Sequence, residues 1–234
     1  MAALVFAPVI DIHSTDRLMI ATNSVYGDRP SLRGRFHQVG ALVSLPAGTF
    51  LVVDLAAPAA RLSAAVYALT GFLMFLTSAS YHRVADSVMA RFWMRRLDHS
   101  MIFIHIAGAT TPIAILGVGG RLGLWLLIVS WTGAVIGSLL KLTQLTIERD
   151  PCPWLFPALG WLPLLAVPSL MANGGRSAAT LLVGSALVYA VGGICFSRKH
   201  PNPVPTVFGY HEIFHVCTLV AGAAQFALTA RLAA

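Results

Sequence analysis

Charged residues are scarce in this chain. Only 11% of its 234 residues are Asp, Glu, Lys or Arg, whereas 57% are hydrophobic, and the mean hydropathy is +0.76. Soluble domains carry about 25% charged residues, so this composition excludes an ordinary soluble protein and indicates one that folds in a bilayer. The net charge of +7 points to a membrane surface rather than to nucleic acid, because the sequence shows no soluble module with a basic, aromatic-rich face.

Cysteine is also rare. The three cysteines, Cys152, Cys195 and Cys217, show no CxxC spacing, which argues against a disulfide scaffold and against a thiolate metal site. The sequence has no low-complexity tract, no long linker and no convincing internal repeat, and its first ten residues lack the basic start of a cleaved signal peptide. We therefore expect one transmembrane domain, residues 37–234, preceded by a cytoplasmic N-terminal segment, residues 1–36.

Long apolar runs dominate the rest of the sequence. A spanning helix needs about 20 mostly apolar residues, and these runs lack the alternating pattern of membrane β-strands. The sequence predicts an all-α integral membrane protein, a bundle of seven transmembrane helices in the inner (plasma) membrane. The predicted spans are 37–54, 60–81, 98–118, 121–141, 153–172, 177–196 and 209–230.

Basic residues fall unequally on the two sides of these spans, with twelve on one side and four on the other. Short loops rich in Lys and Arg stay in the cytoplasm, which predicts a cytoplasmic N-terminus and a C-terminus outside. The larger group is Arg17, Arg29, Arg33, Arg35, Arg83, Arg91, Arg95, Arg96, Lys141, Arg149, Arg198 and Lys199, and the smaller is Arg61, Arg121, Arg176 and Arg231.

The longest cytoplasmic loop lies between the second and third predicted spans. Val84, Val88 and Phe92 recur there at i, i+4 and i+8, as in a helix that lies on the membrane surface. An ordinary connecting helix with solvated arginines explains the same pattern equally well. Both interpretations stay open.

Residue types that bind metals collect at the ends of three apolar stretches. His211 and His215 begin the last predicted span, in the sequence HEIFH. His82 ends the second span, and Asp98 begins the third. The charge rule places all four on the cytoplasmic side, although it was applied without them. Because ionisable residues inside a membrane are costly and usually functional, this agreement favours a shared site.

The donor set suits zinc. His211 and His215 are four residues apart and share one helix face, and with His82 they supply the three imidazoles that bind Zn2+ with one open position. Asp98 is expected to hold a water as the fourth ligand, and direct binding by Asp98 stays an alternative. A water on zinc ionises near pH ~7, and the carboxylate could accept its proton. Ser78, one turn before His82, could steady an oxyanion or orient a ligand.

HEIFH also matches the HExxH pattern of zinc proteases, in which the glutamate activates water. Those enzymes need a third ligand, usually further along the chain, and no Asp, Glu or His follows His215. We therefore expect Glu212 to be a helix N-terminal carboxylate stabilised by the helix dipole. His37 is a weaker ligand candidate, and His99 and His105 are expected to pack or to form hydrogen bonds.

Five short motifs together resemble those of a known family: PSLRGRFH at 30–37, SASYH at 78–82, LDH at 97–99, GATTP at 108–112 and HEIFH at 211–215. The chain resembles the hemolysin III family, bacterial relatives of the progestin and adipoQ receptors in a superfamily that includes the alkaline ceramidases. The resemblance covers nearly the whole chain. It implies a seven-helix bundle with a cytoplasmic N-terminus and zinc held by His82, His211 and His215, with Asp98 on the zinc-bound water and Ser78 beside it.

This resemblance implies more than one function. The family name implies membrane lysis, and the ceramidases imply hydrolysis of a lipid amide. Our leading hypothesis is a zinc-dependent hydrolase whose lipid amide or ester enters from the inner leaflet, so that a membrane lipid is the expected partner, as substrate or ligand. The alternatives are a non-enzymatic sensor or signalling protein with structural zinc, and a cytolytic pore, for which the sequence shows no polar stripe. No oligomeric state is predicted.

Overall fold

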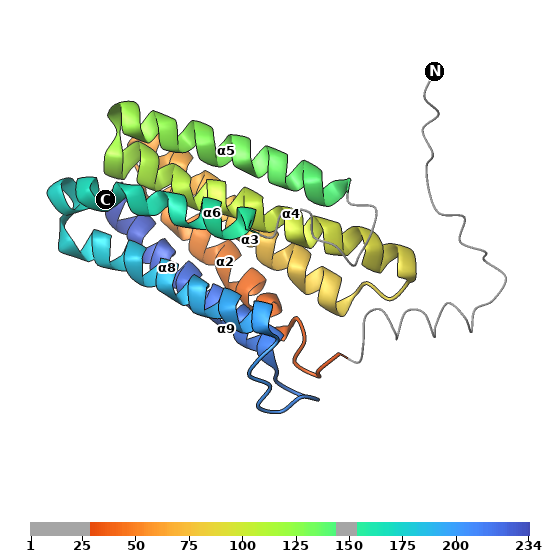
Figure 1. The fold of residues 1–234 in the computed structure, drawn as a ribbon. Helices are drawn as coiled ribbons and strands as arrows, with labels where there is room; N and C mark the ends of the chain where they lie inside the picture. Colours follow the sequence, from red (N-terminus) through yellow and green to blue (C-terminus); the bar gives the residue numbers. More distant parts are fainter. Residues whose placement is uncertain (1–28, 144–153) are drawn as a thin grey trace, which may run out of the picture.

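The computed structural model describes residues 29–143 and 154–234, which are helical apart from short connections (Figure 1). The predicted all-α membrane fold is confirmed, and the only β-structure among the described residues is an isolated bridge between Val204 and Phe208. The helical elements are α2 (Arg35–Val53), α3 (Pro58–Arg83), α4 (Val88–Pro112), η1 (Ile113–Val118), α5 (Gly120–Leu142), α6 (Leu155–Trp161), η2 (Leu162–Ala166), α7 (Val167–Ser169), η3 (Leu170–Gly174), α8 (Gly175–Arg198) and α9 (Tyr210–Ala233).

Six helical stretches in the described ranges are long and apolar enough to cross a membrane. One of them, Leu155–Arg198, has 44 residues and as a straight rod would measure about 66 Å, roughly twice the hydrocarbon thickness. It instead turns back near Gly175, so that α6 and α8 lie side by side (Figure 1). Gly175 has φ 79°, a conformation that favours glycine. This stretch therefore holds the fifth and sixth predicted spans, and the total of seven stays a prediction.

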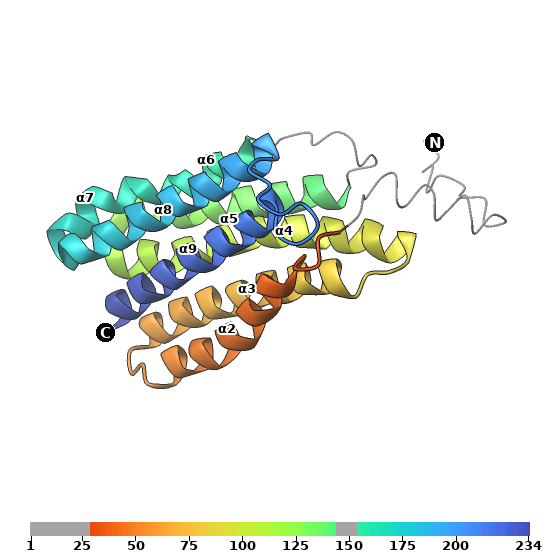
Figure 2. The same ribbon diagram turned by 90° about the horizontal axis from the view of Figure 1, so that it is seen from below.

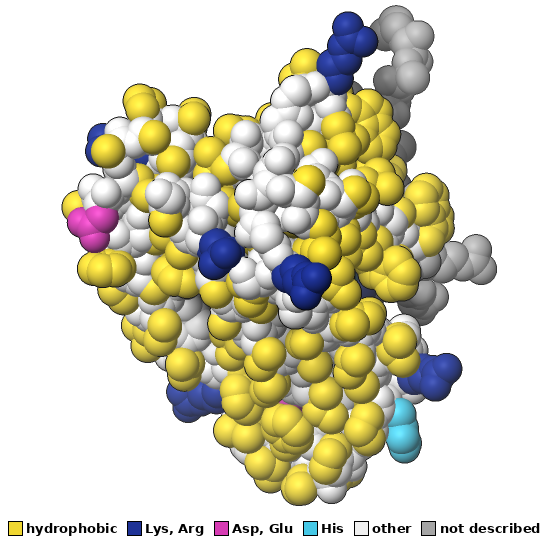
Figure 3. Space-filling model, turned by 90° about the vertical axis from the view of Figure 1, so that its left-hand side faces the viewer, with side chains coloured by type: hydrophobic (Ala, Val, Ile, Leu, Met, Phe, Trp, Pro, Cys, Tyr) yellow, Lys and Arg dark blue, Asp and Glu magenta, His cyan; other side chains and the backbone are white. Residues whose placement is uncertain are grey.

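Large apolar side chains cover the outside of the bundle. Leu42 and Phe50, for example, are 72% and 73% exposed. Figure 3 looks onto the end of the bundle that is on the left in Figure 1, and hydrophobic side chains fill most of that view between isolated Lys and Arg side chains. Water would penalise so much contiguous apolar surface, whereas lipid requires it. The protein is therefore a multi-pass membrane protein.

Helix α9 packs among helices that are distant from it in the sequence. It contacts α2, α3 and α4 as well as its neighbour α8, and Figure 2 shows it between α8 and α3. Its last residues lie at the end of the bundle opposite to the start of α2 (Figures 1 and 2). As a result, the beginning of α9 meets the end of α3.

Glycine permits the closest helix contacts. A Cβ atom at Gly108 of α4 would lie 2.1 Å from Thr70 Oγ1 of α3, and one at Gly137 of α5 would lie 2.7 Å from the Phe103 ring of α4. Real carbon atoms cannot approach so closely, so α3, α4 and α5 pack at separations that only glycine allows at these two positions.

Helix α4 differs from its prediction at its N-terminal end. It begins at Val88 and continues without a break through Asp98 to Pro112, so residues 88–97 form neither a separate surface-lying helix nor a separate connecting helix, the two interpretations that the sequence left open. The segment is instead the first part of the spanning helix. Ser87 Oγ accepts a hydrogen bond from the Ala90 N–H at 3.1 Å and caps this helix.

Residues 29–34 pack on the bundle. The backbone N–H groups of Ser31 and Leu32 donate to the carbonyls of Thr206 and Val207 at 3.0 and 3.3 Å. These bonds tie the chain before α2 to the loop before α9. The described end of the predicted N-terminal segment therefore lies directly against the transmembrane domain.

Candidate metal centre

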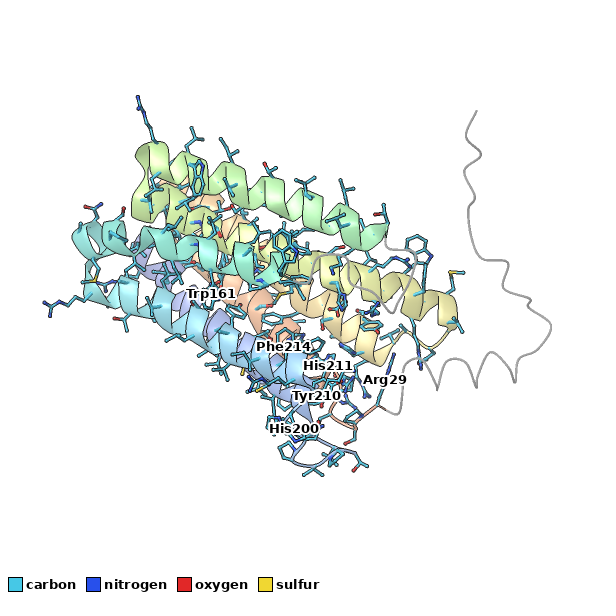
Figure 4. All side chains as sticks on the ribbon, in the orientation of Figure 1. Arg29, Trp161, His200, Tyr210, His211 and Phe214 are labelled. Atoms are coloured by element: carbon cyan, nitrogen blue, oxygen red, sulfur yellow. The ribbon has the colours of Figure 1, made fainter. Side chains whose placement is uncertain are left out.

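Two helix ends carry the candidate ligands. His82 lies in the last turn of α3, and His211 and His215 lie in the first two turns of α9, at the end of the bundle where Figure 4 labels His211. Helix α9 starts after Gly209, whose N–H donates to Glu212 Oε2 at 2.9 Å. A carboxylate at this position of a helix satisfies a backbone donor that would otherwise be unpaired. The start of α9 is therefore fixed at the point where its two histidines face α3.

Three imidazoles converge there. The ligand nitrogens of His82, His211 and His215 all lie within 4.8 Å of one another, and His82 Nε2 lies 3.2 Å from His211 Nε2. A tetrahedral zinc ion with Zn–N bonds of about 2.0–2.1 Å separates its nitrogens by about 3.3 Å. The His82–His211 pair already has this separation, and the remaining nitrogens lie within 4.8 Å of one another.

One ring nitrogen at the centre lacks a partner. His215 Nδ1 is buried and has no hydrogen-bond partner among the described residues. Burying an unsatisfied polar atom costs about 1–3 kcal/mol, and a metal ion bound at this nitrogen would offset that cost. Three imidazoles form a donor set that fits zinc.

Asp98 and Ser78 lie beside the histidines, as the sequence predicted. Asp98 Oδ2 is 4.0 Å from His82 Nε2, and the Asp98 carboxyl interacts with the Ser78 hydroxyl. Both side chains are buried. Asp98 stands well inside α4 rather than at its start, because this helix begins at Val88. The structure thus brings the five predicted residues together, and their roles stay predictions.

His37 of α2, which the sequence predicted only as a weaker ligand candidate, also lies beside these residues. Its ring stacks on that of His215, with centroids 3.7 Å apart and planes 6° apart. His37 Nδ1 lies 2.8 Å from Ser78 Oγ, and Nε2 lies 2.7 Å from Thr218 Oγ1. In the sequence, His37 stood out only by its position at the cytoplasmic start of a predicted span, on the same side of the membrane as the three proposed ligands.

The other candidate histidines lie outside the triad. His105 packs near Tyr67, with ring centroids 5.8 Å apart, and its Nδ1 is 3.4 Å from Thr70 Oγ1, in agreement with the predicted packing role. His99 is half-buried and does not belong to the three-histidine group.

Glu212 is fully buried, and Arg33 Nε donates to its Oε1 at 2.5 Å. Together with the bond from Gly209, this contact confirms the predicted helix N-terminal carboxylate. The glutamate of HEIFH is engaged by an arginine and a backbone N–H, and this engagement favours a structural role over the activation of water.

Two arginines from residues 29–34 flank the centre. Arg33 pairs with Glu212, and an Arg29 amino group donates to the His82 carbonyl at 2.9 Å; Figure 4 shows Arg29 and His211 at the same end of the bundle. Burial lowers the pKa of Arg29 from its usual value, and the positive charge of Arg91 lowers it further. An arginine nevertheless stays protonated in proteins, so the centre has a fixed positive charge at this edge.

The family model for haemolysin-III-related proteins matches residues 26–226, a range that includes every residue of the centre. The chain belongs to this family. It is 29% identical over 194 residues to Hemolysin-3 of Bacillus cereus, an alignment that covers 81% of this chain and 85% of the relative. It is 28% identical over 193 residues to a Hemolysin-3 homolog of Bacillus subtilis (strain 168), covering 81% and 87% of the two chains. The predicted family is confirmed, and a plasma-membrane location is consistent with these bacterial relatives.

Proposed function

We propose that this haemolysin-III-related protein is a zinc-dependent hydrolase of a lipid amide or ester. The observation that supports the proposal is the convergence of His82, His211 and His215, with the Asp98 carboxylate 4.0 Å from His82. Three imidazoles supply the ligands of a hydrolytic zinc site, and a nearby carboxylate supplies a general base.

A zinc ion held by these three imidazoles would lower the pKa of a coordinated water to about 7 and would polarise a carbonyl oxygen. His82, His211 and His215 would hold the metal. Asp98 would accept the proton of the attacking water and return it to the leaving amine or alcohol, while the Ser78 hydroxyl orients the carboxylate. Four of these five side chains are buried and His211 is half-buried, so bulk water is largely excluded and electrostatic interactions inside are strengthened.

A lipid is the substrate class that suits the position of this centre. The three histidines stand at the ends of spanning helices, α3 and α9. The predicted orientation, with twelve basic residues on this side and four on the other, puts the centre at the inner leaflet. A lipid whose amide or ester bond sits just below its head group would present that bond at this depth.

The test is to measure bound metal and lipid turnover in the same sample. Full-length protein purified in mild detergent is expected to contain about one zinc per chain and to release a fatty acid or long-chain base from a whole-membrane lipid extract. His82→Ala is expected to lose both the metal and the turnover. Zinc-free wild-type protein that rejects added zinc would contradict the proposal, as would metal-loaded protein that leaves every lipid unchanged.

A second candidate is a sensor or signalling protein in which zinc has a structural role. It is favoured by the origin of the ligands, because His82 and His211 belong to different helices and are 129 residues apart in sequence. A metal between them would cross-link α3 to α9. This candidate predicts that His211→Ala lowers thermal stability sharply, and that intact, metal-loaded protein shows no turnover.

The relatives are named Hemolysin-3 and Hemolysin-3 homolog, and these names also raise the hypothesis that this chain permeabilises membranes. That hypothesis predicts release of a trapped dye from liposomes containing the purified protein. Vesicles that stay tight at high protein load would exclude it.

A further inference from the structure

His37 is more than a neighbour of the metal centre, because it connects three helices by hydrogen bonds. Its Nδ1 bonds with Ser78 of α3 at 2.8 Å, and its Nε2 bonds with Thr218 of α9 at 2.7 Å. The ring is buried in α2, 4% exposed. Since both ring nitrogens are used, His37 has no free nitrogen with which to bind a metal, and its role must be exerted through its neighbours.

A neutral imidazole has one donor and one acceptor nitrogen, so His37 can donate to one of these two hydroxyls and accept from the other. Thr218 Oγ1 also lies 2.8 Å from the His215 carbonyl oxygen. Whichever nitrogen carries the proton, the His37 ring links Ser78 of α3 to Thr218 of α9.

Both ends of this chain of hydrogen bonds reach the proposed metal centre. At one end, Thr218 is bonded to the backbone of His215, and the His37 ring lies flat on the His215 ring at 3.7 Å. At the other end, Ser78 interacts with Asp98, which lies beside His82. A change at His37 is therefore transmitted to a ligand on α9 and to the candidate base on α4.

We propose that His37 is a positioning residue of the metal centre. Through its hydrogen bonds it holds the Ser78 hydroxyl in one orientation beside Asp98, and it fixes α9 at Thr218 so that the His215 ring faces the metal. The inference rests on the proposed function, because it requires that the three histidines bind a metal. It goes further by assigning a role to a residue outside the ligand set and by identifying hydrogen bonding, rather than ring stacking, as the means.

Two substitutions of His37 distinguish a role through hydrogen bonding from a role through ring stacking. His37→Phe keeps a flat ring against His215 but removes both hydrogen bonds, whereas His37→Gln removes the ring but still offers a donor group and an acceptor, as a neutral imidazole does. The same two changes at His105, a buried histidine on α4 that bonds with Thr70 outside the centre, are the matched controls.

The measurement is binding of Co2+, a spectroscopic substitute for zinc, to full-length protein in detergent after removal of native metal. His37→Phe is expected to weaken Co2+ binding about tenfold, as loss of residues that orient metal ligands does, and to change the visible absorption of bound cobalt. His37→Gln is expected to stay within about threefold of wild type with an unchanged spectrum. Both His105 variants are expected to match wild type.

Each outcome decides between the proposals. Wild-type protein that binds neither cobalt nor zinc would overturn the metal centre and this role together. Normal wild-type binding with an unaltered His37→Phe would overturn the role of His37 alone, as would equal losses in the Phe and Gln variants. If His37→Phe fails to fold, Thr218→Val, which has nearly the same shape, interrupts the chain of bonds at α9 and is expected to change the cobalt spectrum; an unchanged spectrum counts against the proposal.

Discussion

At the scale of single residues, the proposed chemistry depends on one carboxylate. Asp98 is 4.0 Å from His82 Nε2 and interacts with Ser78, a position that suits transfer of a proton but leaves the three imidazoles to hold the metal. Asp98→Asn is therefore expected to keep bound zinc within about threefold of wild type and to lower turnover at least 100-fold, because general bases contribute about 10²–10⁴-fold.

The measurement for Asp98→Asn is zinc per chain by atomic spectroscopy together with the rate of lipid product release. Asp54→Asn, at an exposed carboxylate near the end of α2, is the control and should match wild type in both. Turnover that survives in Asp98→Asn would remove this residue from its role as base.

The partly buried ion pair of Glu212 and Arg33 joins the chain before α2 to the start of α9. Because Glu212 is fully buried and also binds the Gly209 N–H, Glu212→Gln leaves the Arg33 guanidinium without its counter-charge. Breaking a fully buried pair in this way costs about 3–5 kcal/mol, and the partial exposure of Arg33 reduces this cost. We expect a clear fall in the thermal midpoint, measured by the loss of helical circular dichroism, and no such fall in Asp54→Asn. A midpoint equal to that of wild type would show that the pair contributes little.

Most of the candidate centre could be predicted because its residue types are rare in apolar helices. His82, His211 and Asp98 stand out against their apolar surroundings, and the charge rule gave them a common depth. His37 had the same depth, but its partners are Ser78 and Thr218, 41 and 181 residues away. Hydroxyl residues are ordinary in membrane helices, so only the packing of three helices could show which ones His37 meets.

At the scale of helices, the long apolar runs predicted most elements. They did not predict that α4 starts at Val88, because arginines interrupt the apolar run there. Arg91, Arg95 and Arg96 resemble a loop in the sequence. In the structure Arg96 is buried, with its guanidinium carbon 3.4 Å from the centroid of the Phe92 ring. Such a cation–π contact lowers the cost of placing a charge inside a helix bundle. Composition alone does not show that an arginine lies against an aromatic ring.

The contact between α3 and α4 gives a prediction at this scale. In Gly108→Ala the new Cβ would lie 2.1 Å from Thr70 Oγ1, so the two helices must separate, at a cost of about 1–3 kcal/mol. Gly184→Ala, where no atom lies within 4 Å of the new Cβ, is the matched control and should be neutral or slightly stabilising.

Thermal unfolding of Gly108→Ala, Thr70→Ala and the double variant tests this contact. Removing the Thr70 hydroxyl and methyl groups relieves part of the clash, although Thr70 Cβ itself stays 2.9 Å from the new Cβ, so the double variant should be more stable than the sum of the two single effects by at least about 0.5 kcal/mol. Strict additivity would mean that the loss in Gly108→Ala has another cause.

At the scale of the whole molecule, the unequal distribution of Lys and Arg predicts that the C-terminus lies outside the cytoplasm. Alkaline phosphatase, which is active only outside the cytoplasm, should be active when it is fused after Ala234 and inactive when it is fused after Lys199, in the loop before α9. The reverse pattern would invert the topology and would move the metal centre to the outer leaflet.

Removal of metal should weaken the whole bundle. A ligand present at 100 times its dissociation constant stabilises the folded state by about 2.7 kcal/mol, so a strong chelator should lower the thermal midpoint of zinc-loaded protein by roughly 5–10 °C. In His82→Ala the chelator should have almost no effect. Equal shifts in both proteins would show that the chelator acts elsewhere.

The wide separation of His82 and His211 in the sequence has a consequence for biogenesis. During synthesis His82 is added early, whereas His211 and His215 are added only with α9. A nascent or prematurely terminated polypeptide therefore cannot bring the three histidines together. Metal bound at the proposed centre would therefore distinguish finished molecules from fragments.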